Sequence, residues 1–124
     1  MTSFDADALV DAYIEAQNLG SITNANHPLW WSVEYFMDID NHEKANHVWI
    51  YILRIIEKQP SEKVLGMIGA GPLEDLINQY GDKFIEKIEI EARTNPQFRK
   101  VLSFVWRQDT DDEIWSRVMA ATGK

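Results

Sequence analysis

The sequence contains no cysteine in its 124 residues. Disulfide bonds and thiolate-based zinc or iron–sulfur sites are therefore excluded. A chain without cysteine is compatible with a reducing cytosol, and residues 1–11 lack the basic and apolar regions of a signal peptide. We therefore expect a cytoplasmic protein.

Long apolar runs are also absent. No stretch approaches the roughly 20 consecutive apolar residues that a helix needs to span a bilayer, so we expect no membrane association. Apolar residues nevertheless make up 45% of the chain, with five tryptophans, five phenylalanines and four tyrosines. That content is sufficient to bury a core without covalent crosslinks, and the length is usual for one domain. The sequence therefore predicts a single helical domain over residues 1–124.

Positive charge is missing from the first third of the chain. Residues 1–43 hold no lysine or arginine but eight acids: Asp5, Asp7, Asp11, Glu15, Glu34, Asp38, Asp40 and Glu43. The net charge of the whole chain is −8, so residues 44–124 sum to zero. A nucleic-acid interface needs basic residues against phosphate, and this segment supplies none. The negative segment favours a basic protein partner; the alternative is that an acidic surface only keeps the protein soluble.

Helix signals recur along the chain, and no segment alternates like a strand. A capping box at Thr2–Asp5 and Gly20 bound the first helix, and Pro28 opens a second that runs to about Ile39. The remaining helix starts and breaks are marked by Asp40-Asn41-His42, Pro60-Ser61, Gly69-Ala70-Gly71-Pro72, Gly81-Asp82, Asn95-Pro96 and the capping box Thr110–Glu113. We expect an all-α fold of seven or eight short helices in stacked antiparallel pairs.

A weak internal repeat in the sequence leaves two possible helix arrangements. Lys63-Val64-Leu65 recurs 37 residues later as Lys100-Val101-Leu102. That period is close to HEAT-type helical repeats, although similarity between amphipathic helices explains it equally well. The architecture is therefore either HEAT-like or an irregular bundle.

Several short segments resemble an uncharacterised family of small bacterial proteins, filed as a domain of unknown function. The most specific is the Ala-Gly-Pro-Leu-Glu-Asp-Leu motif at residues 70–76; the others are Trp31 with Glu34, residues 95–99 and Val105-Trp106. The resemblance extends over about residues 28–118. It implies an all-helical fold and a bacterial or phage origin, and it carries no established activity.

Candidate chemistry is sparse. His42 and His47 are five residues apart, whereas two histidines on one helical face need a spacing of four, so we expect no metal site and no cofactor. Glu74 and Asp75 occupy the expected first turn of a helix, where acids interact favourably with the helix dipole. Glu74 is positioned to reach back to the backbone N–H of Gly71. Neither carboxylate is predicted to be catalytic.

The second helix carries the candidate contact residues. One stripe, predicted to face the core, consists of Leu29, Trp30, Val33, Phe36 and Met37. A different face presents Trp31, Glu34, Tyr35 and Asp38 at helical spacing. Aromatic anchors beside charges are typical of a protein-binding patch. The alternative is a helix buried on both sides, with Glu34 paired to a base such as Arg54.

The sequence thus predicts a non-catalytic protein-binding module, for example an immunity or inhibitor protein that acts as a monomer or homodimer. It would contact a basic partner through Trp31, Glu34, Tyr35, Asp38, Asp5 and Asp11. One alternative is a small hydrolase or transferase that uses Glu34, His47 or Glu74 between helices. A second alternative is an adaptor that self-associates through its aromatic face.

Overall fold

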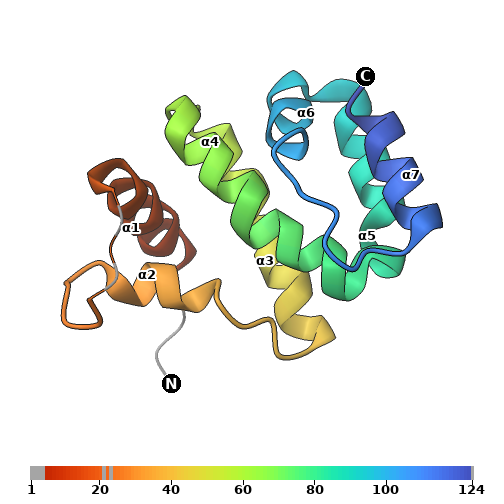
Figure 1. Cartoon of the computed structure of the whole chain (residues 1–124). Helices are drawn as coiled ribbons and strands as arrows, with labels where there is room; N and C mark the ends of the chain where they lie inside the picture. Colours follow the sequence, from red (N-terminus) through yellow and green to blue (C-terminus); the bar gives the residue numbers. More distant parts are fainter. Residues whose placement is uncertain (1–4, 21, 23, 124) are drawn as a thin grey trace.

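The computed structural model describes residues 5–20, 22 and 24–123, and all regular structure in them is helical (Figure 1). In chain order the α-helices are α1 (Ala6–Leu19), α2 (Trp30–Tyr35), α3 (His42–Glu57), α4 (Glu62–Ile68), α5 (Glu74–Thr94), α6 (Pro96–Leu102) and α7 (Asp112–Ala121), with a π-helical segment η1 (Gly69–Leu73) between α4 and α5. The predicted all-α fold is confirmed. None of the helices in these residues is long and apolar enough to cross a membrane.

The predicted N-caps explain most helix starts. Asn41 accepts a hydrogen bond from the Lys44 N–H, Ser61 is the N-cap of α4, and Asn95 accepts from the Phe98 N–H. Such caps satisfy backbone donors that the first turn leaves free. Of the predicted capping box at Thr2–Asp5, residues 2–4 lie outside the described residues, and the N-cap of α1 is Asp5. The N-cap of α7 is Asp111 rather than the predicted Thr110.

The predicted break at Gly69–Pro72 is wrong. The chain stays helical through this segment because η1 joins α4 directly to α5, and the described part of the chain has six helices when α4, η1 and the kinked α5 are counted as one. Proline in an α-helix lacks an N–H and clashes with the carbonyl four residues earlier. The wider π-helical turn accommodates Pro72 without ending the helix.

The predicted helix end at Gly81 coincides with a kink, because the non-helical backbone of Tyr80 divides α5 into two helical stretches. Helix α5 passes through this position with a kink at Tyr80, whose φ and ψ are −134° and 25°. Gly81 is buried against α7, and a Cβ there would lie 2.9 Å from Cγ2 of Ile114. Its small size therefore serves the close packing of two helices.

Helix α2 is shorter than predicted. It starts after a turn in which the Trp30 N–H donates to the His27 carbonyl, and it ends where Met37 N–H donates to the Glu34 carbonyl, three residues earlier. This tighter last turn ends α2 at Tyr35. The loop that follows carries Asp38 and Asp40 at the surface.

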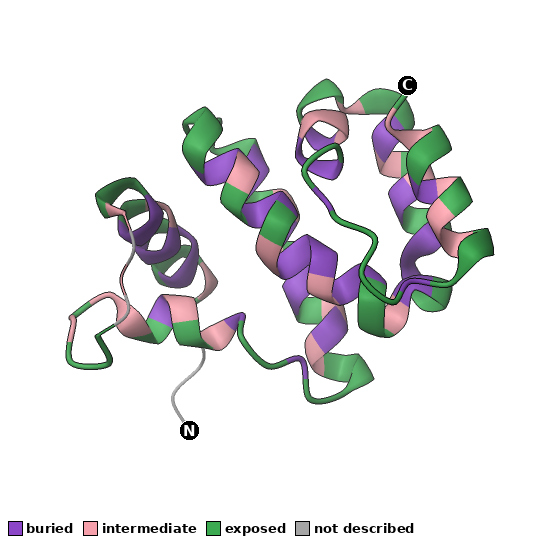
Figure 2. Ribbon diagram, viewed as in Figure 1, coloured by how far each residue is buried: buried purple, intermediate pink, exposed green. Residues whose placement is uncertain are grey.

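One apolar core connects the helices (Figure 2). Helix α1 packs on α2, α3 and α4, while α6 and α7 pack against α5 at the other end (Figure 1). In the centre, Trp49 of α3 contacts the rings of Phe84 and Phe98, at centroid distances of 5.9 and 5.5 Å. This core fixes α1, α2 and η1 relative to one another.

Candidate binding surface and groove

The face of α2 that carries Trp31 is exposed to solvent. The Trp31 side chain is 43% exposed, and Glu34 and Asp38 are exposed beside it. Glu34 accepts a hydrogen bond from Nε1 of Trp30 at 3.1 Å, and its predicted alternative partner Arg54 pairs with Asp7. The alternative of a helix buried on both sides is therefore wrong for Trp31 and Glu34.

The predicted core stripe of α2 is only partly correct. Phe36 is buried, but Met37 is exposed and Leu29, Trp30 and Val33 are only half-buried. Ser32, one turn before Phe36, is fully buried and donates to the Leu29 carbonyl at 2.7 Å. The buried stripe of α2 is thus narrower than its apolar residues suggest.

Tyr35 belongs to an aromatic cluster between α2 and α3. Its ring contacts Phe36 and Tyr51, at centroid distances of 5.2 and 5.7 Å, and Nζ of Lys44 lies 4.7 Å above it. Burial, followed by the proximity of Tyr51, raises the pKa of Tyr35 to about 12. The phenol is therefore neutral at physiological pH.

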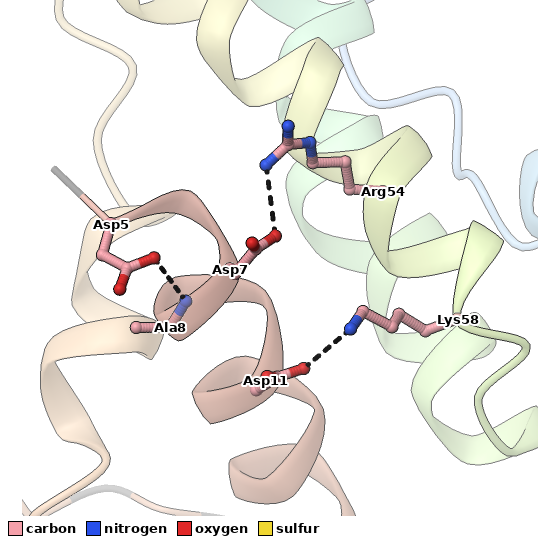
Figure 3. A network of polar contacts seen from close by, with 6 residues as sticks. All are labelled: Asp5, Asp7, Ala8, Asp11, Arg54 and Lys58. Atoms are coloured by element: carbon pink, nitrogen blue, oxygen red, sulfur yellow. Dashed lines mark hydrogen bonds and ion pairs between the residues drawn. The ribbon is translucent and has the colours of Figure 1, made fainter.

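The acids of the first third fall into two groups. On α1, Asp7 pairs with Arg54 at 3.4 Å and Asp11 pairs with Lys58 at 3.3 Å, so α3 neutralises this face (Figure 3). Asp5 accepts a hydrogen bond from the Ala8 N–H as the helix cap (Figure 3). Within the described residues, no ion pair involves the second group: Glu15, Glu34, Asp38, Asp40 and Glu43.

Among the acids of residues 1–43, four of the five in the second group therefore lie in residues 34–43. Of the six predicted contact residues, Trp31, Glu34 and Asp38 lie on or next to α2 and are exposed. Tyr35 is half-buried, and Asp5 and Asp11 are engaged on α1. We call residues 31–43 the acidic surface from here on.

A groove lies next to the acidic surface, and sequence reasoning missed it. Helices α1 and α2 and the segment η1 enclose a cavity of about 180 Å³, lined by Tyr13, Gln17, Val33, Phe36, Met37, Met67, Gly71, Pro72 and Asp75. Three residues of the Ala-Gly-Pro-Leu-Glu-Asp-Leu motif line the groove: Gly71 and Pro72 in η1 and Asp75 in the first turn of α5. Single π turns inside α-helices are frequent at functional sites.

Asp75 places a carboxylate at this groove. Burial, and secondarily the neighbouring Glu74, raises the pKa of Asp75 above its ordinary value. Glu74 points elsewhere: it accepts from the Trp106 N–H at 2.8 Å and from Nε2 of Gln108 at 2.9 Å. The predicted bond from Glu74 to the Gly71 N–H is therefore wrong, since the helix does not begin there.

The three residues proposed for an enzyme site, Glu34, His47 and Glu74, each contact different groups. Glu34 bonds Trp30, His47 stacks on Tyr51, and Glu74 holds the loop after α6. None of the three lines the groove, nor the cavity of about 520 Å³ between α5 and α7.

Comparison with known proteins identifies a family whose function is not known. The model of a family of unknown function (DUF6869) matches residues 20–124. No curated protein and no solved structure matches the chain. The matched range includes the acidic surface and residues 70–76, whereas α1, with Tyr13 and Gln17, lies outside it.

Proposed function

This chain belongs to the family of unknown function DUF6869, and we propose that it is a non-catalytic protein-binding module for a basic partner. One observation carries the proposal. The acidic surface combines a half-exposed tryptophan with four exposed carboxylates that form no ion pair within the described residues: Glu34, Asp38, Asp40 and Glu43.

The chemistry of this surface matches what protein interfaces use. A tryptophan supplies a large contact area, and surrounding charges select and steer the partner. Asp7 and Asp11 are neutralised by their ion pairs with Arg54 and Lys58. The proposed contact therefore centres on α2 and the loop after it. The concrete form that we propose is an immunity or inhibitor protein of a bacterial cytoplasm.

Charge reversal at two matched pairs of sites tests the proposal. Asp38→Lys with Asp40→Lys reverses the acidic surface, and Asp82→Lys with Glu86→Lys makes the same change in net charge at exposed positions of α5. We expect only the first variant to lose the partner in affinity capture from the source cell. With the purified partner, association of the unmodified protein should slow as salt increases. Equal capture by both variants contradicts the proposal.

A second function has one specific observation in its favour. Trp106 is 72% exposed, and its backbone is held in place by the buried Glu74. A fixed, exposed tryptophan suits an adaptor that self-associates. Sedimentation at two concentrations tests this: a concentration-dependent mass that Trp106→Ser abolishes supports self-association, and a constant monomer mass excludes it.

A further inference from the structure

The groove beside the acidic surface is lined mainly by apolar residues, and its volume is about that of one side chain. Val33 of α2, with Phe36 and Met37 just after that helix, forms one side, and Met67 of α4 and Pro72 of η1 form the other. Its volume of about 180 Å³ is below the roughly 300–1,000 Å³ of pockets that hold whole small molecules. Two flexible methionines at its edge adapt to the shape of an inserted group.

Two buried polar side chains of this groove have no hydrogen-bond partner in the part of the chain that the structure describes. Tyr13 is 3% exposed and Gln17 is 8% exposed, yet neither side chain forms a hydrogen bond to another described residue. Buried polar groups are almost always hydrogen-bonded. Among the described residues, only Thr110 Oγ1 is both fully inaccessible and unpaired, so the polar atoms of Tyr13 and Gln17 keep some accessible surface, and both residues line the groove.

Asp75 adds a negative charge to these two groups. No lysine or arginine of the described residues forms an ion pair with it. Its raised pKa means that folding places the charged carboxylate where its surroundings disfavour it. A bound cation would reverse that cost.

The combined lining selects one kind of group. An anion would be repelled by Asp75, and a purely apolar side chain would leave three polar groups unpaired. A guanidinium has five N–H donors, no acceptor and a flat face that stacks on aromatic rings. It would meet acceptors on Asp75, Gln17 and Tyr13, while its aliphatic stem lies on the apolar lining.

We propose that this groove binds the side chain of an arginine of the basic partner, with Asp75 as the counter-ion and Tyr13 and Gln17 as additional acceptors. The proposal rests on the proposed function, because the groove shares α2 with the acidic surface. It adds a specific pocket to what is otherwise a field of negative charge.

Methyl resonances report the groove directly. With ¹³C-methyl-methionine protein, a capped Gly-Arg-Gly peptide should shift the signals of Met37 and Met67 and leave Met119, on α7, unchanged. The matching citrulline peptide has the same shape without the charge and should shift neither. The lysine peptide should bind more weakly than the arginine peptide, because an ammonium has only three donors.

Three variants separate binding in the groove from the general effect of negative charge. Asp75→Asn should weaken binding of the arginine peptide at least about tenfold, the size expected for losing charged hydrogen bonds. Tyr13→Phe keeps the ring packing and should weaken binding less. Asp82→Asn, at an exposed position of α5 outside both the groove and the acidic surface, should leave the Met37 and Met67 shifts intact. Unchanged affinity in Asp75→Asn, or equal shifts with citrulline, overturns the proposal.

A second probe keeps this inference distinct from the proposed function. A nonapeptide of alternating arginine and glycine should bind the unmodified protein and bind Asp38→Lys/Asp40→Lys more weakly. Loss of that effect with the groove shifts retained overturns the proposed function alone. Binding of the nonapeptide without groove shifts overturns the arginine pocket alone.

Discussion

Glu74 connects the central motif to the loop that carries Trp106. Its side chain is 8% exposed and accepts hydrogen bonds from the Trp106 N–H and the Gln108 amide. Glu74→Ala leaves both donors without their acceptor, so we expect a loss of about 1–3 kcal/mol in the free energy of unfolding. Urea denaturation measures the loss, and hydrogen exchange at the Trp106 amide should become faster. Glu86→Ala, an exposed acid on the same helix, should change stability by less than about 0.5 kcal/mol.

Asp75 has the opposite effect on stability at neutral pH. Its pKa is raised in the folded state by burial and then by Glu74. The folded state therefore holds the proton more tightly than the unfolded state, and stability falls as pH rises from the ordinary aspartate pKa through the raised value. We expect Asp75→Asn to be more stable than the unmodified protein at pH 7. The difference should vanish below about pH 3.9.

Urea unfolding at pH 7 and pH 3.5 checks this prediction. Asp82→Asn, an exposed carboxylate on the same helix, is the control and should show no comparable gain at pH 7. A less stable Asp75→Asn protein at pH 7 contradicts the prediction. A gain in stability with a loss of arginine binding would mean that Asp75 is retained for binding rather than for folding.

The residue-level chemistry of the acidic surface was predictable in part. Helical spacing correctly grouped Trp31 with Glu34, and both are exposed. The ion pairs of Asp7 and Asp11 were not predictable, because they depend on α1 packing against α3. The spacing of residues along a helix identifies which side chains share a face of that helix. It does not identify the charged residues of the helices that pack against it.

At the level of elements, the two glycines of η1 have different roles. A Cβ at Gly69 would collide with the carbonyl oxygen of Val101 and lie 2.8 Å from Cβ of Phe104, whereas a Cβ at Gly71 meets nothing within 4 Å. Gly69→Ala should therefore destabilise the protein by about 1–3 kcal/mol through overpacking. Gly71→Ala should be neutral or stabilising by up to about 1 kcal/mol, since alanine favours the helix.

Thermal and urea unfolding of the two glycine variants, side by side, measure this difference. Both remove one glycine from the same segment, so each controls for the other's effect on the unfolded chain. Equal stability of the two proteins would contradict the close approach of η1 to α6.

Local signals predicted helix starts better than helix continuity. Asn41, Ser61 and Asn95 each act as the cap that their sequence context indicates. Gly69, Gly71 and Pro72 are equally strong local signals for a break, but the chain stays helical there and Gly69 serves a close helix contact. The signal at Gly81 marks a kink at Tyr80 rather than a loop. A π turn absorbs the proline, and no local rule distinguishes that outcome from a stop.

At the level of the whole molecule, the groove depends on the long-range fold. Its polar groups come from α1 and α5, which are far apart in the sequence. Its apolar lining comes from α2 and the two residues after it, and from α4 and η1. The motif at residues 70–76 and the adjacent acids were visible in the sequence. Gln17 gave no signal of its own, because its importance arises only from its burial without a hydrogen-bond partner among the described residues.

The position of the negative charge, rather than its amount, should determine binding of a basic ligand. Asp7→Asn with Asp11→Asn and Asp38→Asn with Asp40→Asn remove the same charge from the chain. The first pair is neutralised by Arg54 and Lys58, and removing it exposes two cations beside α1. Surface ion pairs contribute about 0–1 kcal/mol each, so both proteins should remain folded.

We expect the Asp38/Asp40 variant to bind the arginine–glycine nonapeptide more weakly and the Asp7/Asp11 variant to bind it nearly as well as the unmodified protein. Fluorescence anisotropy of labelled peptide at two salt concentrations measures this, with a smaller salt dependence expected for the Asp38/Asp40 variant. Equal weakening in both variants would mean that only net charge matters. In that case the separation of paired acids on α1 from unpaired acids after α2 would have no role in recognition.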